Sequence, residues 1–344
     1  MVSLGGLFRT VSTTSNFGAA IFLKVSGRRT LIVFRNGMRE ELNWKEYCKT
    51  RDWFDKLSKK SFKIEKIVDR YNVKRKEDNF GYFSNSFVGA QNFFEFIMQL
   101  ESDNCTLVFI NESELSIKKY NASFTIRKLE DNLLEMTSKN VIMTGPIDSI
   151  SFFFFESKYY ECNCKDKTVL DVGGYCGETA VFFSNQGAKR VIIYEPVLSH
   201  HRLIEKNIEV NNVEAELHAE GLGTADGTKQ IHYENTNVDF GRSNFGINEI
   251  SVKLKNATKL IIESKADIGK FDCEGAEECL TEVPNEILRK INYYIIETHT
   301  PKIRKAIIEK FAEAGFKMNQ QPRDLTSEVS ILYFDKSEAS IKID

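Results

Sequence analysis

The sequence predicts an α/β fold in which a mostly parallel β-sheet occupies the C-terminal half of the chain. Three observations lead to this prediction. From about residue 166 onward, strand-like runs alternate with helix-like segments, and short connections between such elements favour right-handed crossovers and parallel strands. An apolar run at residues 168–172 leads directly into a turn with three glycines. Acidic residues stand where several of the strand-like runs end.

The chain has the composition of a globular protein. Its 344 residues are 42% hydrophobic and 28% charged, with a formal net charge of −2, so bulk charge does not point to nucleic acid or membrane. No segment reaches the roughly 18 apolar residues of a membrane span. The first residues lack the charged region and cleavage pattern of a signal peptide. We therefore expect a cytoplasmic protein without a membrane partner, and the sequence leaves its oligomeric state open.

The seven cysteines do not form a disulfide framework, because their number is odd and they are spread over the chain. Cys162 and Cys164 form a C-x-C pair, but a matching second pair is absent. We expect reduced, mostly buried thiols and no structural metal.

Residues 1–150 are expected to form a mixed α/β accessory region, whose role the sequence leaves open. Residues 44–77 have helical character and are rich in Lys and Arg. An amphipathic helix is predicted at 86–102. Short strands are predicted at residues 105–110, 122–127, 140–145 and 149–155.

Residues 151–344 are expected to form the domain that contains the parallel sheet. Its predicted strands end near Val172, Glu195, Glu220, Asp272 and His299, and a last strand covers residues 329–335. Helices are predicted from about residue 177, at 199–212, from about Glu274, and at 301–315, and a polar, glycine-rich excursion is expected at 221–247. Ligands of such sheets bind beyond the carboxyl ends of the strands.

The glycine turn "DVGGYCG" distinguishes between two kinds of nucleotide ligand. Gly173, Gly174 and Gly177 allow the backbone to bend sharply and to approach a ligand closely. A dinucleotide would place its anionic pyrophosphate at this turn, where the carboxylate of Asp171 would oppose it. S-adenosylmethionine has no phosphate and carries a sulfonium and an ammonium group, which a nearby carboxylate favours. The turn therefore predicts S-adenosylmethionine as the cofactor.

The second and third strands supply further predicted contacts to this cofactor. Glu195 stands 24 residues after Asp171 at the tip of the second strand, where an acid can accept both ribose hydroxyls. Glu220 and Gly221 follow the third strand, and the loop there is expected to flank the adenine. The predicted cofactor-binding residues are Asp171, Gly173, Gly174, Gly177, Thr179, Glu195, Glu220 and Gly221.

Four segments together resemble the FkbM-type methyltransferases, a branch of the class I S-adenosylmethionine-dependent enzymes. These are "VLDVGGYCGETA", "IIYEP", "KFDCEGAEECL" and "IIETHTP". The resemblance covers about residues 150–336 and is strongest in the D-x-E-G-x-E element; Gly174 stands where the family usually has Ala. It implies a Rossmann-like seven-stranded sheet and methylation of an oxygen, often a hydroxyl on a sugar or small metabolite.

A neutral hydroxyl is a poor nucleophile, so a base at the carboxyl end of the sheet would assist the transfer. Asp272, Glu274 and His299 are the predicted catalytic residues. Glu277 and Glu297 are also ionisable there, and Glu277 is expected to be structural. Asp272 and Glu274 could share a divalent metal, but no further ligand set is evident in the sequence, so none is predicted.

Two other functions stay open. The basic run at 56–76 suits phosphate contacts, so an RNA methyltransferase is an alternative, although a small-molecule or glycan acceptor is favoured. The chain could also bind the cofactor without catalysis. The polar loop at residues 235–247, with Arg242, is predicted to contact the acceptor.

Overall fold

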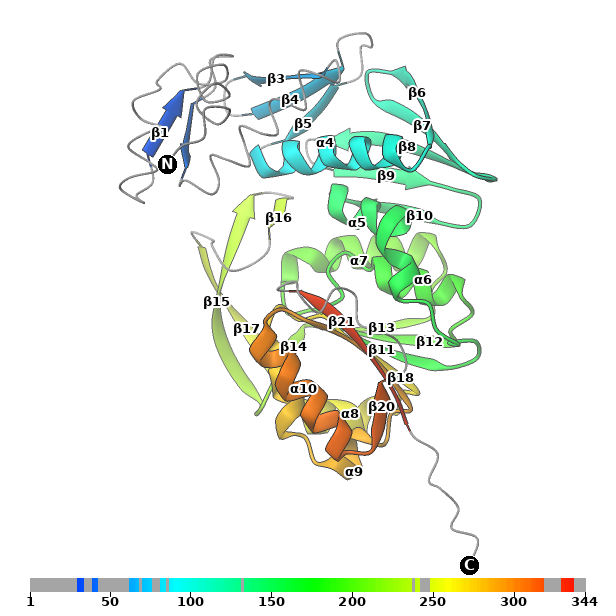
Figure 1. The fold of residues 1–344 in the computed structure, drawn as a ribbon, viewed down its shortest axis with the longest axis vertical. Coiled ribbons are helices and arrows are strands. Elements are labelled where there is room, and N and C mark those ends of the chain that lie inside the picture. Colours follow the sequence, from blue (N-terminus) through cyan, green and yellow to red (C-terminus); the bar gives the residue numbers. More distant parts are fainter. Residues whose placement is uncertain are drawn as a thin grey trace, which may run out of the picture. The chain divides into compact units, whose positions relative to one another are not determined.

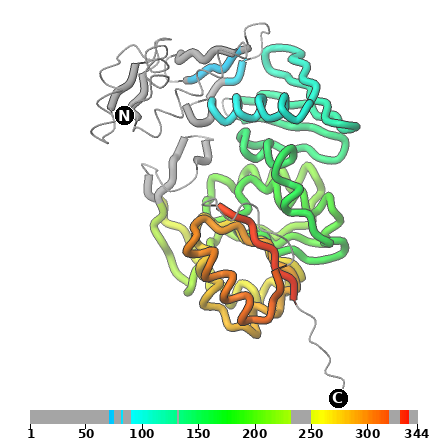
Figure 2. Tube along the Cα trace, in the orientation of Figure 1, coloured from blue at the N-terminus to red at the C-terminus, as the bar shows by residue number. Residues whose placement is uncertain are grey.

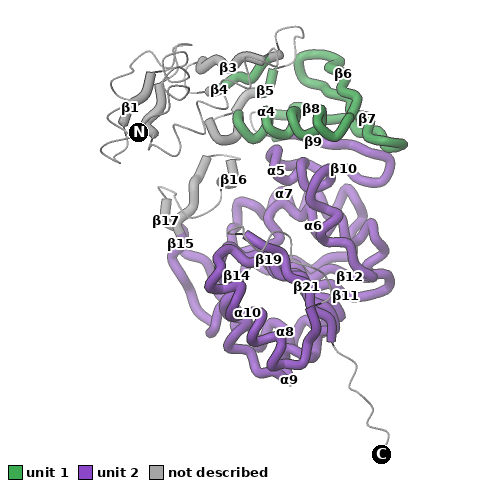
Figure 3. The backbone as a smooth tube through the Cα atoms, in the orientation of Figure 1, with its two compact units in different colours: residues 1–133 green, residues 134–344 purple. Residues whose placement is uncertain are grey.

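The computed structural model describes residues 30–33, 39–42, 62–67, 70–75, 81–84, 87–130, 133–236, 239–241, 248–318 and 329–336 (Figure 1). Figure 2 shows the Cα trace in the same orientation. The chain divides into two compact units, residues 1–133 and 134–344, which are drawn in green and purple in Figure 3. The predicted cofactor-binding domain at 151–344 lies within the second unit, which also includes residues 134–150.

In its described residues, the first unit consists of antiparallel strands and the helix α4 (Figure 1). Its strands are β1 (Thr30–Val33), β2 (Arg39–Leu42), β3 (Phe62–Ile67), β4 (Arg70–Arg75), β5 (Gly81–Ser84), β6 (Thr106–Asn111), β7 (Glu114–Lys119) and β8 (Ala122–Glu130). The predicted amphipathic helix is confirmed as α4 (Phe87–Ser102), which buries Phe93, Phe94 and Ile97 completely.

The helical character expected over residues 44–77 is wrong for the part that the structure describes, because β3 and β4 pair as an antiparallel hairpin. Phe62 and Ile64 alternate with Lys63 and Glu65, which is the period of a strand. The abundance of Lys and Arg concealed that alternation.

The second unit begins with the hairpin of β9 (Leu133–Thr137) and β10 (Ile142–Gly145), followed by α5 (Ile147–Ser151), a π-helical turn (Phe152–Glu156) and a 3₁₀ turn (Ser157–Tyr159). The strand predicted at 149–155 is therefore wrong. A short apolar run does not distinguish a strand from a buried helix. Pro146 directly precedes α5, where its fixed φ of −65° suits a helix start.

The parallel sheet of the second unit has seven strands in the order β13-β12-β11-β18-β19-β21-β20. They are β11 (Thr168–Val172), β12 (Arg190–Tyr194), β13 (Ala215–His218), β18 (Ile268–Phe271), β19 (Tyr293–Thr298), β20 (Phe316–Met318) and β21 (Ser330–Lys336). β21 runs antiparallel to both of its neighbours, whereas β11, β12, β13, β18 and β19 are parallel. This arrangement confirms the predicted fold class, a Rossmann-like seven-stranded sheet.

Helices cover both faces of this sheet (Figure 1). On one face α6 (Glu178–Asn185) and α7 (Leu198–Val210) pack on alternate strand residues such as Val169, Val191 and Ile193. On the other face α8 (Ala257–Ser264), α9 (Asn285–Leu288) and α10 (Pro301–Glu313) pack on Leu170 and Ile192. Burial of both faces explains why the strands are almost continuously apolar. None of the helices in the described part of the chain is long and apolar enough to cross a membrane.

Two local predictions differ from the structure. Much of the excursion expected at 221–247 forms strands: β14 (Glu220–Gly223) and β15 (Gly227–Thr236) both pair with β17 (Asn248–Asn256), and β16 (Asp239–Gly241) pairs with β15. The helix expected from Glu274 is a 3₁₀ helix, η3 (Ala276–Glu282). Gly275, with φ of 102°, precedes it and breaks the continuity that an α-helix from Glu274 would need.

Candidate active site

The carboxyl ends of four neighbouring strands bring the predicted site residues together. β11 ends at the glycine turn, β12 ends beside Glu195, β18 ends before Asp272, and β19 ends before His299. These four strands are parallel and adjacent in the sheet, so the residues that follow them lie along one edge. That edge is where ligands of open α/β sheets bind.

The glycine turn has no room for a side chain at its first position. Gly173 has φ of 85°, and a Cβ there would lie 1.7 Å from the carbonyl oxygen of Asp272. Its N–H donates to the carbonyl of Tyr194 at 2.9 Å. The turn is therefore pressed between the ends of β12 and β18, and Gly177, with φ of 84°, closes it at the start of α6.

Gly174 lies where the glycine turn passes close to the neighbouring strand β12. A Cβ at this position would lie 2.3 Å from Cγ2 of Ile193 in β12. The neighbouring strand therefore already occupies the space that an alanine methyl would need.

Asp171 is completely buried and its charge is paired inside the protein. Its carboxylate lies 3.1 Å from the ammonium of Lys270 in β18 and accepts a hydrogen bond of 2.5 Å from the hydroxyl of Thr179. Lys270 also donates to the carbonyl of Gly173 at 2.6 Å. Burial lowers the pKa of Lys270, but the negative charges of Asp171 and Asp272 outweigh this and hold the pKa above its usual range.

Lys270 is a residue of this site that the sequence analysis missed. It stands at the first position of the "KFDCEG" element, and an isolated lysine in an apolar strand was the available signal. Asp171 and Thr179 help to hold the glycine turn in place, because the hydroxyl of Thr179 donates to Asp171 and Asp171 pairs with Lys270. Their predicted contact with a cofactor stays a prediction.

Glu195 is nearly buried beside the glycine turn. Its Oε2 accepts the N–H of Tyr175 at 3.0 Å, and its Oε1 accepts the N–H of Val197 at 2.9 Å. Nδ1 of His200 lies 3.2 Å from Oε1. The carboxylate therefore joins the end of β12 to the turn after β11. Its predicted contact with ribose hydroxyls stays a prediction.

Glu220 and Gly221 lie in a strand, whereas the sequence analysis placed them in a loop. They belong to β14, which pairs with β17. A Cβ on Gly221 would come within 3.3 Å of Pro196, so this strand passes close to the residue that follows Glu195. The predicted adenine contact stays a prediction.

The glycine turn is held by the amide side chain of Asn207 in α7. Asn207 is completely buried and donates to the carbonyl of Cys176 at 2.8 Å and to that of Thr144 at 2.7 Å, while its oxygen accepts the N–H of Thr144 at 2.8 Å. Asn207 thus ties the glycine turn to β10.

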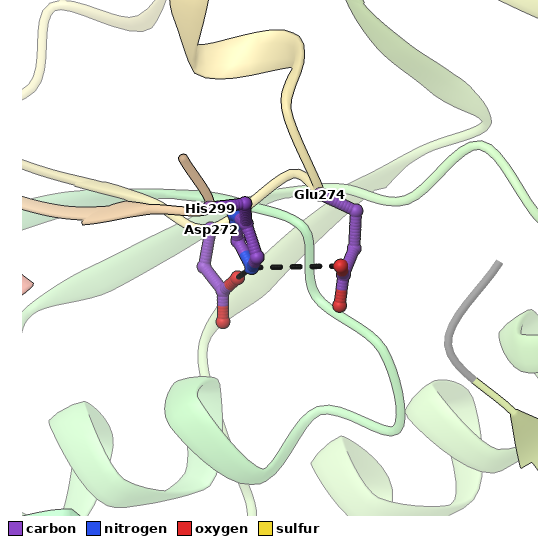
Figure 4. Close-up of side chains that lie close together, drawn as sticks. All are labelled: Asp272, Glu274 and His299. Atoms are coloured by element: carbon purple, nitrogen blue, oxygen red, sulfur yellow. Dashed lines mark ion pairs between the residues drawn. The ribbon is translucent and has the colours of Figure 1, made fainter. Parts of the chain in front are cut away.

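The three predicted catalytic residues lie close together (Figure 4). Nε2 of His299 is 3.6 Å from Oδ1 of Asp272 and 3.5 Å from Oε2 of Glu274. All three side chains keep some exposure, namely 15% for His299, 29% for Asp272 and 38% for Glu274. The cluster is therefore accessible to a ligand at the edge of the sheet.

Glu277 lies behind His299 and holds its ring. Its side chain is completely buried, and its Oε1 lies 3.2 Å from Nδ1 of His299 and accepts the backbone N–H of His299 at 3.1 Å. Its Oε2 accepts the N–H of Gly275 at 2.8 Å. Glu277 therefore fixes both the ring of His299 and the turn that carries Glu274.

Glu297 adds another carboxylate to the cluster. Its Oε1 lies 3.8 Å from Nε2 of His299, and its Oε2 accepts a hydrogen bond of 3.0 Å from the hydroxyl of Tyr160. Burial and the charge of Asp272 raise the pKa of Glu297 to about 7.

The charges around His299 determine its protonation. Burial alone lowers the pKa of His299, but the hydrogen bond to Glu277 and the charges of Asp272 and Glu274 outweigh it and raise the pKa to about 9. With only these protein groups around it, the imidazole is charged at neutral pH. A charged imidazole cannot accept a proton, so this environment favours a carboxylate as the base.

Two predicted features fall outside the described residues. Arg242 and most of the loop at 235–247 are among them, as is much of the basic run at 56–76. Their predicted contacts with an acceptor or with RNA stay predictions.

Comparison with known proteins finds similarity in fold. No protein-family model matches the chain, and no curated protein matches it in sequence. Solved structures do resemble it: a ribosomal protein L11 methylase from Lactobacillus delbrueckii subsp. bulgaricus has 14% identity and a TM-score of 0.36 over 56% of this chain and 81% of that one. An rRNA methylase from Streptococcus thermophilus has 11% identity and a TM-score of 0.35 over 54% of this chain and 96% of that one.

A Streptococcus pneumoniae protein in complex with S-adenosyl-L-methionine has 13% identity and a TM-score of 0.34, over 54% of this chain and 73% of that one. Sequence identities this low show similarity of fold alone. The fold class of this chain is assigned from its strand order and from the antiparallel strand β21. Residues 134–344 therefore contain a Rossmann-like, mostly parallel sheet of seven strands.

Proposed function

We propose that this protein is an S-adenosylmethionine-dependent methyltransferase that methylates a hydroxyl group of a small molecule or glycan. One observation carries the proposal: a glycine turn joined to Glu195 and a carboxylate-rich cluster lie on the same edge of the parallel sheet. The first would hold the cofactor and the second would receive the acceptor.

The cofactor side is supported by the surroundings of Glu195. Because the carboxylate is fixed by the N–H groups of Tyr175 and Val197, it is oriented before a ligand arrives, which lowers the entropic cost of binding. A ribose binds through two adjacent hydroxyls, and a fixed carboxylate is a suitable acceptor for both. A dinucleotide pyrophosphate at the turn would lie near the carboxylate of Glu195, and among the described residues the cation Lys270 is already paired with Asp171.

The acceptor side is supported by the carboxylates of Asp272, Glu274 and Glu297, which surround His299. A hydroxyl bound there has an oxygen acceptor for its proton within the cluster. Bound S-adenosylmethionine would supply the methyl group: the acceptor oxygen would bond to the methyl carbon as the carbon–sulfur bond breaks, giving a methyl ether and S-adenosylhomocysteine. A carboxylate of the cluster would take the hydroxyl proton and later pass it to water.

A hydroxyl acceptor is favoured over an exocyclic base amine by the residues after β18. Enzymes for base amines usually carry an Asn/Asp-Pro-Pro-aromatic element at this place, whereas this chain has Asp272-Cys273-Glu274-Gly275. Two exposed carboxylates would also repel the phosphates of a nucleic acid.

Calorimetric titration of the purified protein with S-adenosylmethionine and, separately, with NAD tests the cofactor assignment. We expect micromolar binding of S-adenosylmethionine alone. Glu195→Ala should weaken it by more than tenfold, whereas Glu214→Ala, which removes an exposed acid just before β13, should leave it unchanged. Thermal denaturation of both variants separates a lost contact from a lost fold.

Transfer of labelled methyl groups to a panel of sugars, hydroxylated metabolites and RNA then identifies the acceptor class. Label in a hydroxylated small molecule or glycan supports the proposal. Label found only in RNA would mean that RNA is the acceptor and would overturn the proposed acceptor class. Cofactor binding without any methyl transfer would indicate a non-catalytic binding protein. Unchanged affinity in Glu195→Ala would overturn the ribose assignment.

A further inference from the structure

Four carboxyl groups surround the imidazole of His299. Asp272, Glu274 and Glu297 lie within 3.8 Å of Nε2 of His299, and Glu277 lies 3.2 Å from Nδ1. Asp272 and Glu274 face the same ring nitrogen and are both partly exposed. A cation that reaches them from solvent would be attracted by their negative charges.

The distances within the cluster differ from those of hydrogen bonds. An N–H···O bond joins its heavy atoms at about 2.9 Å, whereas Nε2 of His299 is 3.5 Å from Glu274 and 3.6 Å from Asp272. Two ligand atoms bound at about 2.1 Å to a tetrahedral ion are about 3.4 Å apart. One ligand atom from each of Asp272, Glu274 and His299 can be chosen so that all lie within 4.8 Å of one another.

A second His–carboxylate pair in the same sheet provides the comparison. Nε2 of His218 lies 2.8 Å from Oε1 of Glu216, which is the length of a direct hydrogen bond. The pair at His218 is thus at hydrogen-bond distance, whereas Nε2 of His299 lies 3.5 Å or more from both Asp272 and Glu274.

Glu277 gives independent support, because it occupies the position that a metal-binding histidine requires behind it. Histidines that bind a metal through one ring nitrogen almost always donate the other N–H to a carboxylate or carbonyl. Nδ1 of His299 faces the completely buried Oε1 of Glu277 at 3.2 Å. This contact directs Nε2 outward, toward Asp272 and Glu274 (Figure 4).

We propose that Asp272, Glu274 and His299 bind one divalent transition-metal cation, Zn²⁺ or Mn²⁺, at the carboxyl edge of the sheet. An imidazole and two carboxylates suit these ions, whereas Mg²⁺ prefers oxygen ligands alone. Three protein ligands leave coordination positions open, as in catalytic sites. The role of the ion depends on the proposed function: it would lower the pKa of the acceptor hydroxyl and hold that oxygen toward the methyl group.

Metal binding is measured on the full chain after treatment with a chelator. Titration with Mn²⁺, followed by the loss of the free-ion signal in electron paramagnetic resonance, gives stoichiometry and affinity, and calorimetry with Zn²⁺ and Mg²⁺ gives the preference. We expect one Mn²⁺ or Zn²⁺ per chain at micromolar affinity and at least tenfold weaker binding of Mg²⁺. His299→Ala and Asp272→Asn should each weaken Mn²⁺ binding by at least tenfold.

His218→Ala is the matched control, because it removes a histidine paired to a carboxylate in the same sheet and should leave Mn²⁺ affinity unchanged. Glu277→Gln, which keeps an oxygen but removes a charge behind His299, should weaken the affinity less than His299→Ala does. Thermal denaturation verifies that each variant is folded.

The proposal is overturned if no stoichiometric Mn²⁺ or Zn²⁺ binding occurs, or if His299→Ala and Asp272→Asn bind Mn²⁺ as the parent does. Titration with S-adenosylmethionine in the presence of chelator distinguishes this failure from that of the proposed function. Cofactor binding without metal binding refutes the metal site alone. Metal binding without cofactor binding or methyl transfer refutes the proposed function alone.

Discussion

The ammonium of Lys270 lies 3.1 Å from the carboxylate of Asp171, and both side chains are buried in the centre of the parallel sheet. Asp171 belongs to β11 and Lys270 to the adjacent β18, at paired positions in the register. This ion pair, with the bond from Lys270 to the carbonyl of Gly173, holds the glycine turn against the strand that leads to Asp272.

Lys270→Met is expected to destabilise the protein by about 3–5 kcal/mol, because it leaves the charge of Asp171 buried without its partner. The double variant Asp171→Asn with Lys270→Met should recover part of this loss, since the unpaired charge is gone. Urea denaturation followed by circular dichroism measures both. Lys302→Met, at an ion pair with Glu278 in which the lysine is 85% exposed, is the control and should change stability by less than about 1 kcal/mol. A double variant that is no more stable than Lys270→Met would contradict this explanation.

Gly174→Ala is expected to destabilise the protein by about 1–3 kcal/mol, because its methyl would overlap Cγ2 of Ile193. Gly227→Ala is the control: a Cβ there meets nothing within 4 Å. Thermal denaturation compares the two variants, and a Gly174→Ala protein as stable as the parent would show that Ile193 moves aside.

Glu178, in the first turn of α6, predicts a dependence of stability on pH. Burial raises the pKa of its carboxyl to about 8 in the folded protein, from an ordinary value of 4.5. Between these two values the unfolded chain ionises while the folded protein stays protonated, so the unfolded state binds fewer protons and stability falls as pH rises. Glu178 also accepts the N–H of Cys176 at 3.1 Å, a bond that a glutamine oxygen can replace.

Glu178→Gln should therefore be about 2–3 kcal/mol more stable than the parent at pH 8 and nearly equal to it at pH 5. Urea denaturation at both pH values measures this difference. Glu205→Gln changes an exposed residue of α7 and should shift stability equally at both. A Glu178→Gln difference that does not grow with pH would refute the raised pKa.

Asn207→Ala is expected to cost about 2–4 kcal/mol, because it removes three hydrogen bonds and leaves buried backbone groups of Thr144 and Cys176 without them. Amide hydrogen exchange should also become faster at Thr144, whose N–H bonds to Asn207. Arg202→Ala, at an exposed position of the same helix, should leave both properties unchanged. Slow exchange at Thr144 in Asn207→Ala would mean that other contacts hold β10 to α7.

Periodic patterns in the sequence were sufficient for the alternating part of the fold. The apolar runs ending near Val172, Glu195, Asp272 and His299 are strands of one sheet, because strands buried on both faces are almost continuously apolar. Periodicity did not predict the structure where a strand and a helix, or a loop and a strand, can have the same residue pattern. The run at 149–155 became helical turns, and the polar stretch after residue 221 became paired strands, since both depend on neighbours remote in the sequence.

By itself, the sequence determined the strand–helix alternation, the glycine turn and which residues end each strand, because these follow from local side-chain periodicity and backbone freedom. Only the tertiary structure decided which of those residues meet. It placed Lys270 against Asp171, fixed Glu195 to the N–H of Tyr175, and set Glu277 behind His299. These contacts join residues on different strands and turns, and burial determines their charge. The physical reason is that pairing across a sheet and exclusion of water act through space, which a pattern along the chain does not record.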